Sequence, residues 1–327
     1  MKTKHYLLSG LFAVTLLSGC GNDYEGADWV GAKMQINGTI SNSGTRVAAD
    51  GNGTDWEPGD AIGLYTSNNG IGNAVNQKFT TTSGGATASF ASETSLYLLT
   101  DQEVNVTGYY PHIEDTRLSD GVYNFSIADE NGTYVVNDFM FASNTVTRGD
   151  AKDTKNVDLA FNHKMNRLQL DFSTSDVEVT CDENTEISCT LNGLITDGTF
   201  NTKTGEIKAN STTGSVTVTH AGPTVYLIYP PQATKDVTLN IKIGDVYYTA
   251  KIPTLAITGP TDNATLKYNV KITGTQVMIT FGGVSISGWN TPGEGGDIET
   301  SKKEHETNGT ADGGSFSDGG SINVTKQ

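Results

Sequence analysis

The 327-residue chain carries 21 lysines and arginines against 37 aspartates and glutamates, which gives a formal net charge of −16. This acidic balance argues against nucleic acid or an anionic lipid surface as the partner. Beyond a short apolar stretch at the N-terminus, no segment is long and apolar enough to predict a transmembrane helix, and the length suffices for two ordinary domains.

Residues 1–19 have the order of a bacterial secretory signal peptide. Two lysines precede an apolar stretch that is too short to span a bilayer as a stable helix. The sequence Leu-Ser-Gly-Cys at residues 17–20 resembles the lipobox of bacterial lipoproteins, in which the peptide is cut before the cysteine and the cysteine is acylated. We therefore expect lipidation at Cys20, which would tether the mature chain to a membrane. The alternative is an ordinary secretory signal with an incidental cysteine.

Residues 20–30 follow as a polar segment with three acids and several small residues. We expect a flexible tether here. The alternative is that acids close to Cys20 act as a surface-export signal, as in some Gram-negative lipoproteins.

Most of the segments that follow alternate apolar and polar residues with a period of two. This pattern is typical of half-buried antiparallel strands, and no stretch keeps a helical apolar stripe for three turns. Clusters of Gly, Asn, Asp, Ser and Thr between the segments predict turns. The clearest alternating segments are Lys33–Ser41, Val122–Ile127, Val157–Met165, Val237–Ile243 and Leu266–Ile272. The sequence therefore predicts an all-β fold of sandwich type.

Two halves of the chain show a weak internal duplication. Glu103–Pro111 and Thr224–Pro231 each end a strand in aromatic residues and proline, and each is followed by an alternating strand. About seven strands can be counted in each half. We predict an N-terminal β-sandwich over residues 31–155 and a C-terminal β-sandwich over residues 156–290, joined by the polar run 147–156.

Residues 291–327 are rich in Gly, Ser, Thr and acids, and we expect a mostly disordered tail because such a composition buries little apolar surface. Only Ser321–Thr325 carries a short alternating pattern. Just before the tail, Gly282 and Gly283 are expected to form a turn at a strand end, since no helix follows that could make them a phosphate cradle.

Cys181 and Cys189 are spaced like residues that flank a hairpin loop. An extracytoplasmic compartment permits a disulfide between them, and free thiols are the equally open alternative. A zinc site is not expected, because no second cysteine or histidine pair lies at ligand spacing.

A set of phrases in a fixed order carries a family resemblance. They are Thr45–Arg46, Trp56–Tyr65, Tyr109–Pro111, Asp138–Ala142, Leu159–Leu168, Tyr226–Gln232 and Ile286–Trp289. Together they resemble the fimbrillin family, the Mfa-like lipoprotein subunits of the type V pili of Bacteroidia. The resemblance covers roughly residues 33–290, and the lipobox agrees with it.

The resemblance implies two transthyretin-like β-sandwiches on a lipoprotein of the outer membrane, exposed at the cell surface and built into a fimbrium. It also implies that an arginine-specific protease removes the N-terminal strand. A strand from another fimbrial subunit then fills the vacated groove. Whether the subunit belongs to the stalk or the tip stays open.

Arg46 fits the expected cleavage, because it follows a strand and a short polar connection and is the first arginine of the chain. A solvated loop arginine is the alternative, and Arg148 is a weaker second candidate. The donor strand is expected in the C-terminal region, either in Gln276–Ile286 or in Ser321–Thr325.

No arrangement of residues predicts catalysis. His163 lies on the apolar phase of its strand and is expected to be a core or interface histidine, whereas His112 is expected at the surface. No hydrolase, zinc or nucleotide motif occurs, so we expect no enzyme activity, no catalytic residue, no metal and no cofactor.

The main alternative function is a monomeric surface lipoprotein that binds glycans. Trp56, Trp289 and the 13 tyrosines could stack on sugars, although most of them are expected in the core. A hydrolase of unrecognised type is a weaker option.

Overall fold

The computed structural model describes residues 31–41, 55–67, 74–99, 101–127, 138–175, 179–234, 237–252, 255–256, 265–273, 276–285 and 322–325. The expected signal peptide, the tether and most of the tail lie outside these residues, as do Cys20, Arg46 and Trp289. Within the described part of the chain, no helix has the length and apolar character needed to cross a membrane.

The described fold consists of strands and one short 3₁₀ helix, η1 (Asp115–Arg117). In chain order the strands are β1 (Ala32–Ile40), β2 (Ala61–Thr66), β3 (Gln77–Thr81), β4 (Thr87–Ala91), β5 (Tyr97–Leu98), β6 (Val104–Tyr110), β7 (Val122–Ser126), β8 (Met140–Val146), β9 (Thr154–His163), β10 (Asn166–Thr174), β11 (Glu186–Ile195), β12 (Asp197–Asn201), β13 (Ile207–Ala209), β14 (Thr213–Ala221), β15 (Thr224–Tyr229), β16 (Ala233–Thr234), β17 (Val237–Ile243), β18 (Val246–Ile252), β19 (Leu255–Ala256), β20 (Thr265–Thr273), β21 (Gln276–Ser285) and β22 (Ile322–Thr325). The all-β class predicted from the period-two patterns is confirmed.

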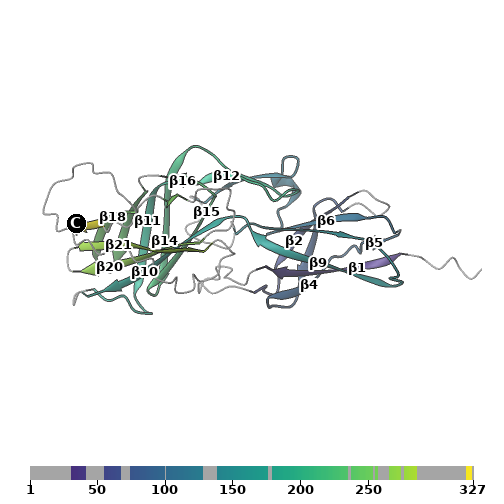
Figure 1. The fold of residues 1–327 in the computed structure, drawn as a ribbon, viewed down its shortest axis with the longest axis horizontal. Coiled ribbons are helices and arrows are strands. Elements are labelled where there is room, and N and C mark those ends of the chain that lie inside the picture. Colours follow the sequence, from purple (N-terminus) through teal and green to yellow (C-terminus); the bar gives the residue numbers. More distant parts are fainter. Residues whose placement is uncertain are drawn as a thin grey trace, which may run out of the picture. The chain divides into compact units, whose positions relative to one another are not determined.

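The first sheet closes on itself. Its strand order is β4-β3-β2-β6-β8-β9-β1-β5, and β4 also pairs with β1. The pairs are antiparallel except for β1 and β9, which run parallel. Because the ring closes through β1, this strand is an interior strand with neighbours on both sides (purple in Figure 1).

Inward-facing side chains of this sheet form one hydrophobic core. It contains alternating residues of β1, β6 and β9 together with Trp56, which lies just before β2. Val157, Leu159 and Phe161 are buried as their alternation predicts, whereas Met165 lies beyond the end of β9 and packs in the second core. The period-two pattern therefore holds only as far as the strand itself extends.

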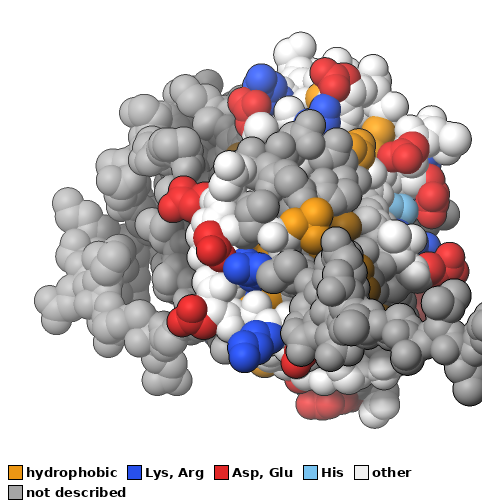
Figure 2. Space-filling view, turned by 90° about the vertical axis from the view of Figure 1, so that its right-hand side faces the viewer, with side chains coloured by type: hydrophobic (Ala, Val, Ile, Leu, Met, Phe, Trp, Pro, Cys, Tyr) orange, Lys and Arg blue, Asp and Glu red, His pale blue; other side chains and the backbone are white. Residues whose placement is uncertain are grey.

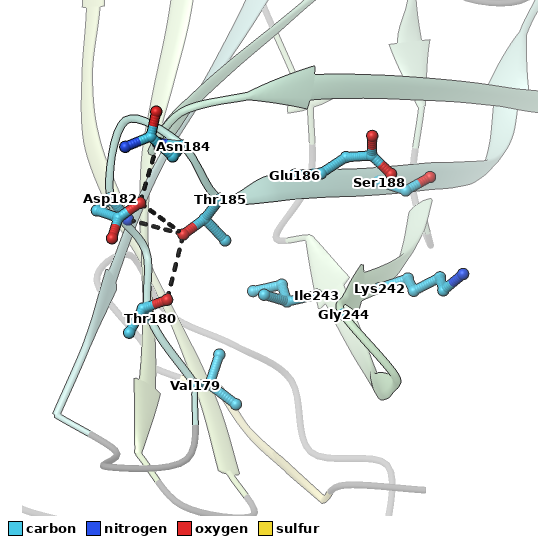
Figure 3. Close-up of a pocket in the computed structure, with 10 residues that line it drawn as sticks. All are labelled: Val179, Thr180, Asp182, Asn184, Thr185, Glu186, Ser188, Lys242, Ile243 and Gly244. Carbon is cyan, nitrogen blue, oxygen red and sulfur yellow. Dashed lines mark hydrogen bonds between the residues drawn. The ribbon is translucent and has the colours of Figure 1, made fainter.

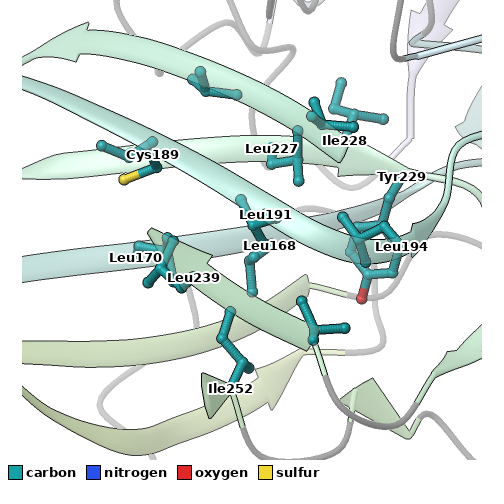
Figure 4. Close-up of a cluster of buried hydrophobic side chains, with 14 of the residues drawn as sticks. Leu168, Leu170, Cys189, Leu191, Leu194, Leu227, Ile228, Tyr229, Leu239 and Ile252 are labelled. Atoms are coloured by element: carbon teal, nitrogen blue, oxygen red, sulfur yellow. The ribbon is translucent and has the colours of Figure 1, made fainter. Parts of the chain in front are cut away.

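The second half of the chain forms two further sheets. One has the order β15-β10-β20-β21-β22 and the other β14-β11-β17-β18. Their facing side chains build the second hydrophobic core, part of which Figure 4 shows around Leu168, Leu191 and Leu239. Here β10 and β20 run parallel over eight residue pairs, as β1 and β9 do in the first sheet. The two halves therefore share a parallel pairing of an early strand with a late one, in keeping with the internal duplication in the sequence.

A small sheet, β13-β12-β7, connects the two halves. β7 comes from the first half of the chain, yet it pairs with β12 of the second half over five residue pairs. Side chains of β7, such as Phe125, belong to the second core, where Phe139 stacks on Phe200 with ring centroids 4.6 Å apart. The predicted boundary between residues 155 and 156 falls inside β9, and the chain leaves the first sheet only after His163.

The position of Gly282 and Gly283 differs from the turn that the sequence predicts. Gly282 and Gly283 lie inside β21 and not in a turn at its end. Tyr268 pairs with Phe281 and Lys267 with Gly283, so Gly282 is the extra residue of a β-bulge. Glycines inside a strand often mark such bulges, because the extra residue needs backbone freedom.

The surface of the described residues exposes few large apolar side chains. Val75, Leu99 and Tyr247 are the large hydrophobic residues that are exposed there. Figure 2 shows one face, on which acidic and basic side chains surround a small group of hydrophobic ones. The described surface therefore offers no broad apolar face for assembly.

Candidate functional site: the first strand and its slot

The position that β1 occupies, between β9 on one side and β4 and β5 on the other, is here called the β1 slot. Lys33–Ile40 pairs with Thr154–Phe161 of β9 over eight residues. On the opposite edge, β5 pairs with the start of β1 and β4 with its C-terminal half. Removing β1 would therefore leave backbone N–H and C=O groups unpaired on both walls of the slot.

The inward face of β1 is apolar. Ala32, Met34, Ile36 and Ile40 are all at most 4 % exposed and Gly38 is buried on the same face, while the odd-numbered residues between them point outward. Burial of Met34, Ile36 and Ile40 stabilises the docked strand by roughly 1.5–3 kcal/mol for each side chain. The segment predicted as Lys33–Ser41 is thus confirmed as a strand, with its predicted inward face.

Polar side chains on the outward face fix the register of β1. Asn37 donates from Nδ2 to Oδ1 of Asp158 at 2.9 Å and accepts at Oδ1 from the Ser89 hydroxyl at 2.9 Å. These bonds connect β1 to both β9 and β4. A shift by one residue would break them and turn the apolar face outward.

Trp56 forms the floor of the slot beneath the middle of β1. Its indole Nε1 donates a hydrogen bond of 2.8 Å to the carbonyl oxygen of Gly38, and its side chain is 1 % exposed. The indole meets the rings of Phe90, Tyr110 and Phe161 edge to face, with centroids 5.0, 5.5 and 5.3 Å away. The sequence suggested a core role for most aromatic residues, but nothing in it reveals that this indole contacts the backbone of β1.

Charged side chains are buried where the chain passes from the first sheet to the second. Nδ1 of His163 lies 2.7 Å from Oδ1 of Asp138, and both residues are 1 % exposed. Arg167 is fully buried, with its guanidinium 4.9 Å from the ring centre of Tyr226. Burial lowers the pKa of Arg167 to about 10, while Tyr226 and Asp138 oppose this shift. The guanidinium therefore stays positive at neutral pH and balances the Asp138 carboxylate.

Comparison with known proteins places this architecture in a family. A model of the fimbrillin-like family matches residues 45–289, which is most of the chain. The chain belongs to the fimbrillin-like family. The resemblance drawn from the sequence phrases is thereby confirmed, and with it the assignment of the chain to fimbrial subunits of the cell surface.

Individual relatives agree with the family. The chain is 29 % identical over 219 residues to a protein of Bacteroides uniformis named as fimbrium subunit Fim1C, which covers 65 % of this chain and 69 % of the relative. A crystal structure described as a cell adhesion protein from Bacteroides ovatus superposes with a TM-score of 0.64 at 23 % identity, covering 78 % of this chain and 98 % of that one. A second such structure, from Bacteroides uniformis, gives 0.61 at 20 % identity, covering 80 % and 98 %. The two structures show the shared fold.

The prediction for one histidine of this fimbrillin-like chain is confirmed, and the prediction for another is wrong. His163 is a core histidine with a hydrogen-bonded ring, as predicted. The expectation that His112 is a surface residue is wrong, because its side chain is only 6 % exposed. Burial lowers the pKa of His112, while Glu114, 3.7 Å away, opposes the shift. The turn after β6 folds back onto β2, where the His112 amide donates to the Ala61 carbonyl, and this tertiary contact leaves no local sequence signal.

Arg148, the weaker candidate for cleavage, is held in place. Its side chain is 20 % exposed and lies 3.4 Å from the Asp101 carboxylate. Arg46 lies outside the described residues, so cleavage after Arg46 stays a prediction. Its neighbourhood is bounded by Ser41, directly after β1, and by Asp55, directly before Trp56.

Cys181 and Cys189 are free thiols in the structure. Cys189 is fully buried in β11, and Cys181 packs at the edge of the same core. Burial raises the pKa of both thiols, and the Asp182 carboxylate adds to the shift at Cys181.

This arrangement predicts selective alkylation. In a Cys20→Ser variant at pH 8, iodoacetamide is expected to leave Cys189 unmodified in the native protein, because the reactive thiolate is both suppressed and inaccessible. Both thiols should react in guanidinium without reductant, as measured by peptide mass spectrometry. Labelling in guanidinium that appears only after a reductant is added would show that the two sulfurs are bonded.

An open hollow of about 460 Å³ lies between the segment 179–188 and the turn that joins β17 to β18 (Figure 3). Thr185 accepts and donates hydrogen bonds with Asp182 along its wall. None of its ten lining residues is aromatic. Because Trp56 is buried and Trp289 lies outside the described residues, the structure gives no support to the glycan-binding alternative through these tryptophans.

Proposed function

We propose that this chain is the lipoprotein precursor of a fimbrial subunit that assembles by exchange of strands. The observation that carries the proposal is the position of β1, which closes the first sheet and covers its core. The described surface has no broad apolar face, so the apolar surface that assembly requires would come from opening the β1 slot. An incoming strand would then pair with both walls.

In this proposal Cys20 carries the lipid that holds the precursor at the outer membrane, and an arginine-specific protease cuts after Arg46. The cut separates β1 from Trp56 and β2, so β1 would be held only by its non-covalent contacts. The segment 42–54 is polar and small in composition, as protease-accessible connections usually are.

Of the two donor candidates, the structure favours Ser321–Thr325. β21 pairs with β20 over nine residue pairs and contributes Val277 and Ile279 to the second core. β22 pairs only with β21, over four residue pairs at the edge of the sheet. Releasing β22 therefore breaks fewer contacts than releasing β21. A subunit with such a donor would take a stalk position.

The proposal predicts that cleavage triggers polymerisation. Limited digestion of the full precursor with an arginine-specific protease is expected to remove the N-terminal segment and to yield ladders that resist SDS without heating. Arg46→Gln should remain monomeric under the same conditions, because β1 stays covalently attached. Gel electrophoresis and N-terminal sequencing of the product measure both results.

Three other arginines serve as internal controls. Arg167 is buried and Arg148 is ion-paired, while Arg117 is exposed in η1 and stacks over Tyr123. Arg117→Gln should therefore leave the ladders unchanged. A product that is cut after Arg46 and stays strictly monomeric would contradict strand exchange, and binding of that product on a glycan array would favour the rival function.

A further inference from the structure

Gly38 lies at the middle of β1, directly above the floor of the slot, and it is buried. A Cβ atom built at Gly38 would lie 2.8 Å from Cε2 of Phe90, 3.2 Å from Cε2 of Phe161 and 3.3 Å from Cζ2 of Trp56. The first of these distances is shorter than carbon atoms tolerate, and the other two are tight. The slot therefore has no room for a side chain at this position.

The three rings around Gly38 are packed from their other sides as well. Trp56 is held by its bond to the Gly38 carbonyl and touches both other rings edge to face. Phe161 also faces a second glycine, since a Cβ at Gly108 would lie 3.0 Å from its Cζ. A closely packed aromatic cluster cannot shift to admit even one methyl group without cost.

We infer that the Gly38 position is a steric gate that selects the strand filling the β1 slot: the donor must place a glycine there. This inference rests on the proposed strand exchange and adds the identity and direction of the donor. Both donor candidates contain a glycine, and we assign the slot to residues 320–325 of a second copy of this chain, inserted antiparallel to the direction of β1, because their release breaks fewer contacts.

The antiparallel register follows from the sequence of the tail. With Gly320 at the position of Gly38, Ile322 takes the place of Ile36 and Val324 that of Met34. The residues between them, Ser321 and Asn323, replace outward-facing polar residues. Apolar residues thus fall on the inward positions of Ile36 and Met34 and polar residues on the outward positions, while Asp318 reaches only the position of Ile40, the last residue of β1.

The opposite direction fails at the gate. If the tail runs parallel to β1 with Ile322 at the position of Ile36, Val324 falls at the position of Gly38. With Ile322 at the position of Met34, Lys326 falls there. Placing Gly320 on the gate in this direction instead puts Asp318 at the position of Ile36, which is fully buried. Each of these three parallel registers therefore either places a side chain that clashes at the Gly38 position or buries the Asp318 charge in the middle of the slot.

The direction also affects the backbone pairing. β1 runs parallel to β9, its longer partner in the slot. A donor that enters antiparallel to β1 would run antiparallel to β9, over up to eight residue pairs, but parallel to β4 and β5, over up to six. Because antiparallel ladders are only slightly more stable for each residue pair, the backbone pairing is nearly balanced and the side chains decide the direction.

The first experiment tests the gate in the intact chain. Gly38→Val is expected to raise the deuterium exchange rate of the β1 amides by at least about tenfold, because overpacking forces the strand out of its slot. Gln35→Val places the same side chain on the exposed face of β1 and should leave exchange close to the parent. Unchanged protection of β1 in Gly38→Val would overturn the gate.

The second experiment tests the donor after cleavage with the arginine-specific protease. Gly320→Val is expected to reduce the yield of SDS-resistant ladders by about tenfold or more, whereas Gly319→Val, one residue away, should not. Both variants keep the sequence of the slot intact. Equal yields from the two variants would overturn the assignment of residues 320–325.

The outcomes separate the inference from the proposed function. If the parent chain is cut after Arg46 and forms no ladders, strand exchange itself is refuted and residues 320–325 are refuted as its donor. The deuterium exchange of Gly38→Val still decides whether the gate exists, since it is measured without cleavage.

Discussion

A Trp56→Ala variant is expected to unfold with a free energy about 3–5 kcal/mol lower than the parent, because a large buried aromatic side chain is lost from a packed core. The indole supports Phe90 and Phe161 and donates to the Gly38 carbonyl. Its loss leaves a cavity directly under β1. Guanidinium unfolding followed by far-UV circular dichroism measures the change.

Trp56→Phe separates packing from hydrogen bonding. It keeps an aromatic ring but removes the N–H donor, and we expect a smaller loss of about 0.5–1.5 kcal/mol from the missing hydrogen bond to the Gly38 carbonyl. In both variants the β1 amides should exchange faster than in the parent. A Trp56→Ala variant as stable as the parent would show that the indole does not support the slot.

Replacement of Arg167 by methionine is expected to cost about 1–3 kcal/mol, because it removes a buried positive charge that interacts with the Asp138 carboxylate, which keeps its hydrogen bond to His163. The two residues are at most 1 % exposed, and their charges interact. The loss should appear as a lower midpoint in guanidinium unfolding. Arg167→Lys keeps the charge but loses the planar contact with Tyr226, so it should be affected less.

A double variant tests the electrostatic cause. Asp138→Asn combined with Arg167→Met removes both charges, and it should be more stable than the sum of the single losses predicts. Strict additivity would mean that the two residues act independently and that the loss at Arg167 comes from packing alone.

Local alternation was enough to predict several strands and their buried faces. β1, β9 and β17 show this clearly, because each has polar and apolar residues in strict turn and one face in a core. Strands of two or three residues, such as β13, β16 and β19, are too short to show a pattern, so the count of about seven strands is too low for the second half.

Features that depend on distant pairing could not be predicted. The parallel ladder of β1 with β9 joins residues more than a hundred positions apart, and the bond from Trp56 to Gly38 depends on that arrangement. The same holds for β7, whose alternation was recognised but whose partner, β12, lies in the other half. For the candidate site, sequence alone indicated the strand and the arginine but not the glycine at the gate.

The pairing of β7 with β12 has a mechanical consequence for a fibre. Tension that pulls the two halves apart would act on the five residue pairs between β7 and β12, in addition to the covalent connection from β9 to β10. The two halves would therefore separate only after this pairing is broken. A filament built from such subunits would extend little before it breaks.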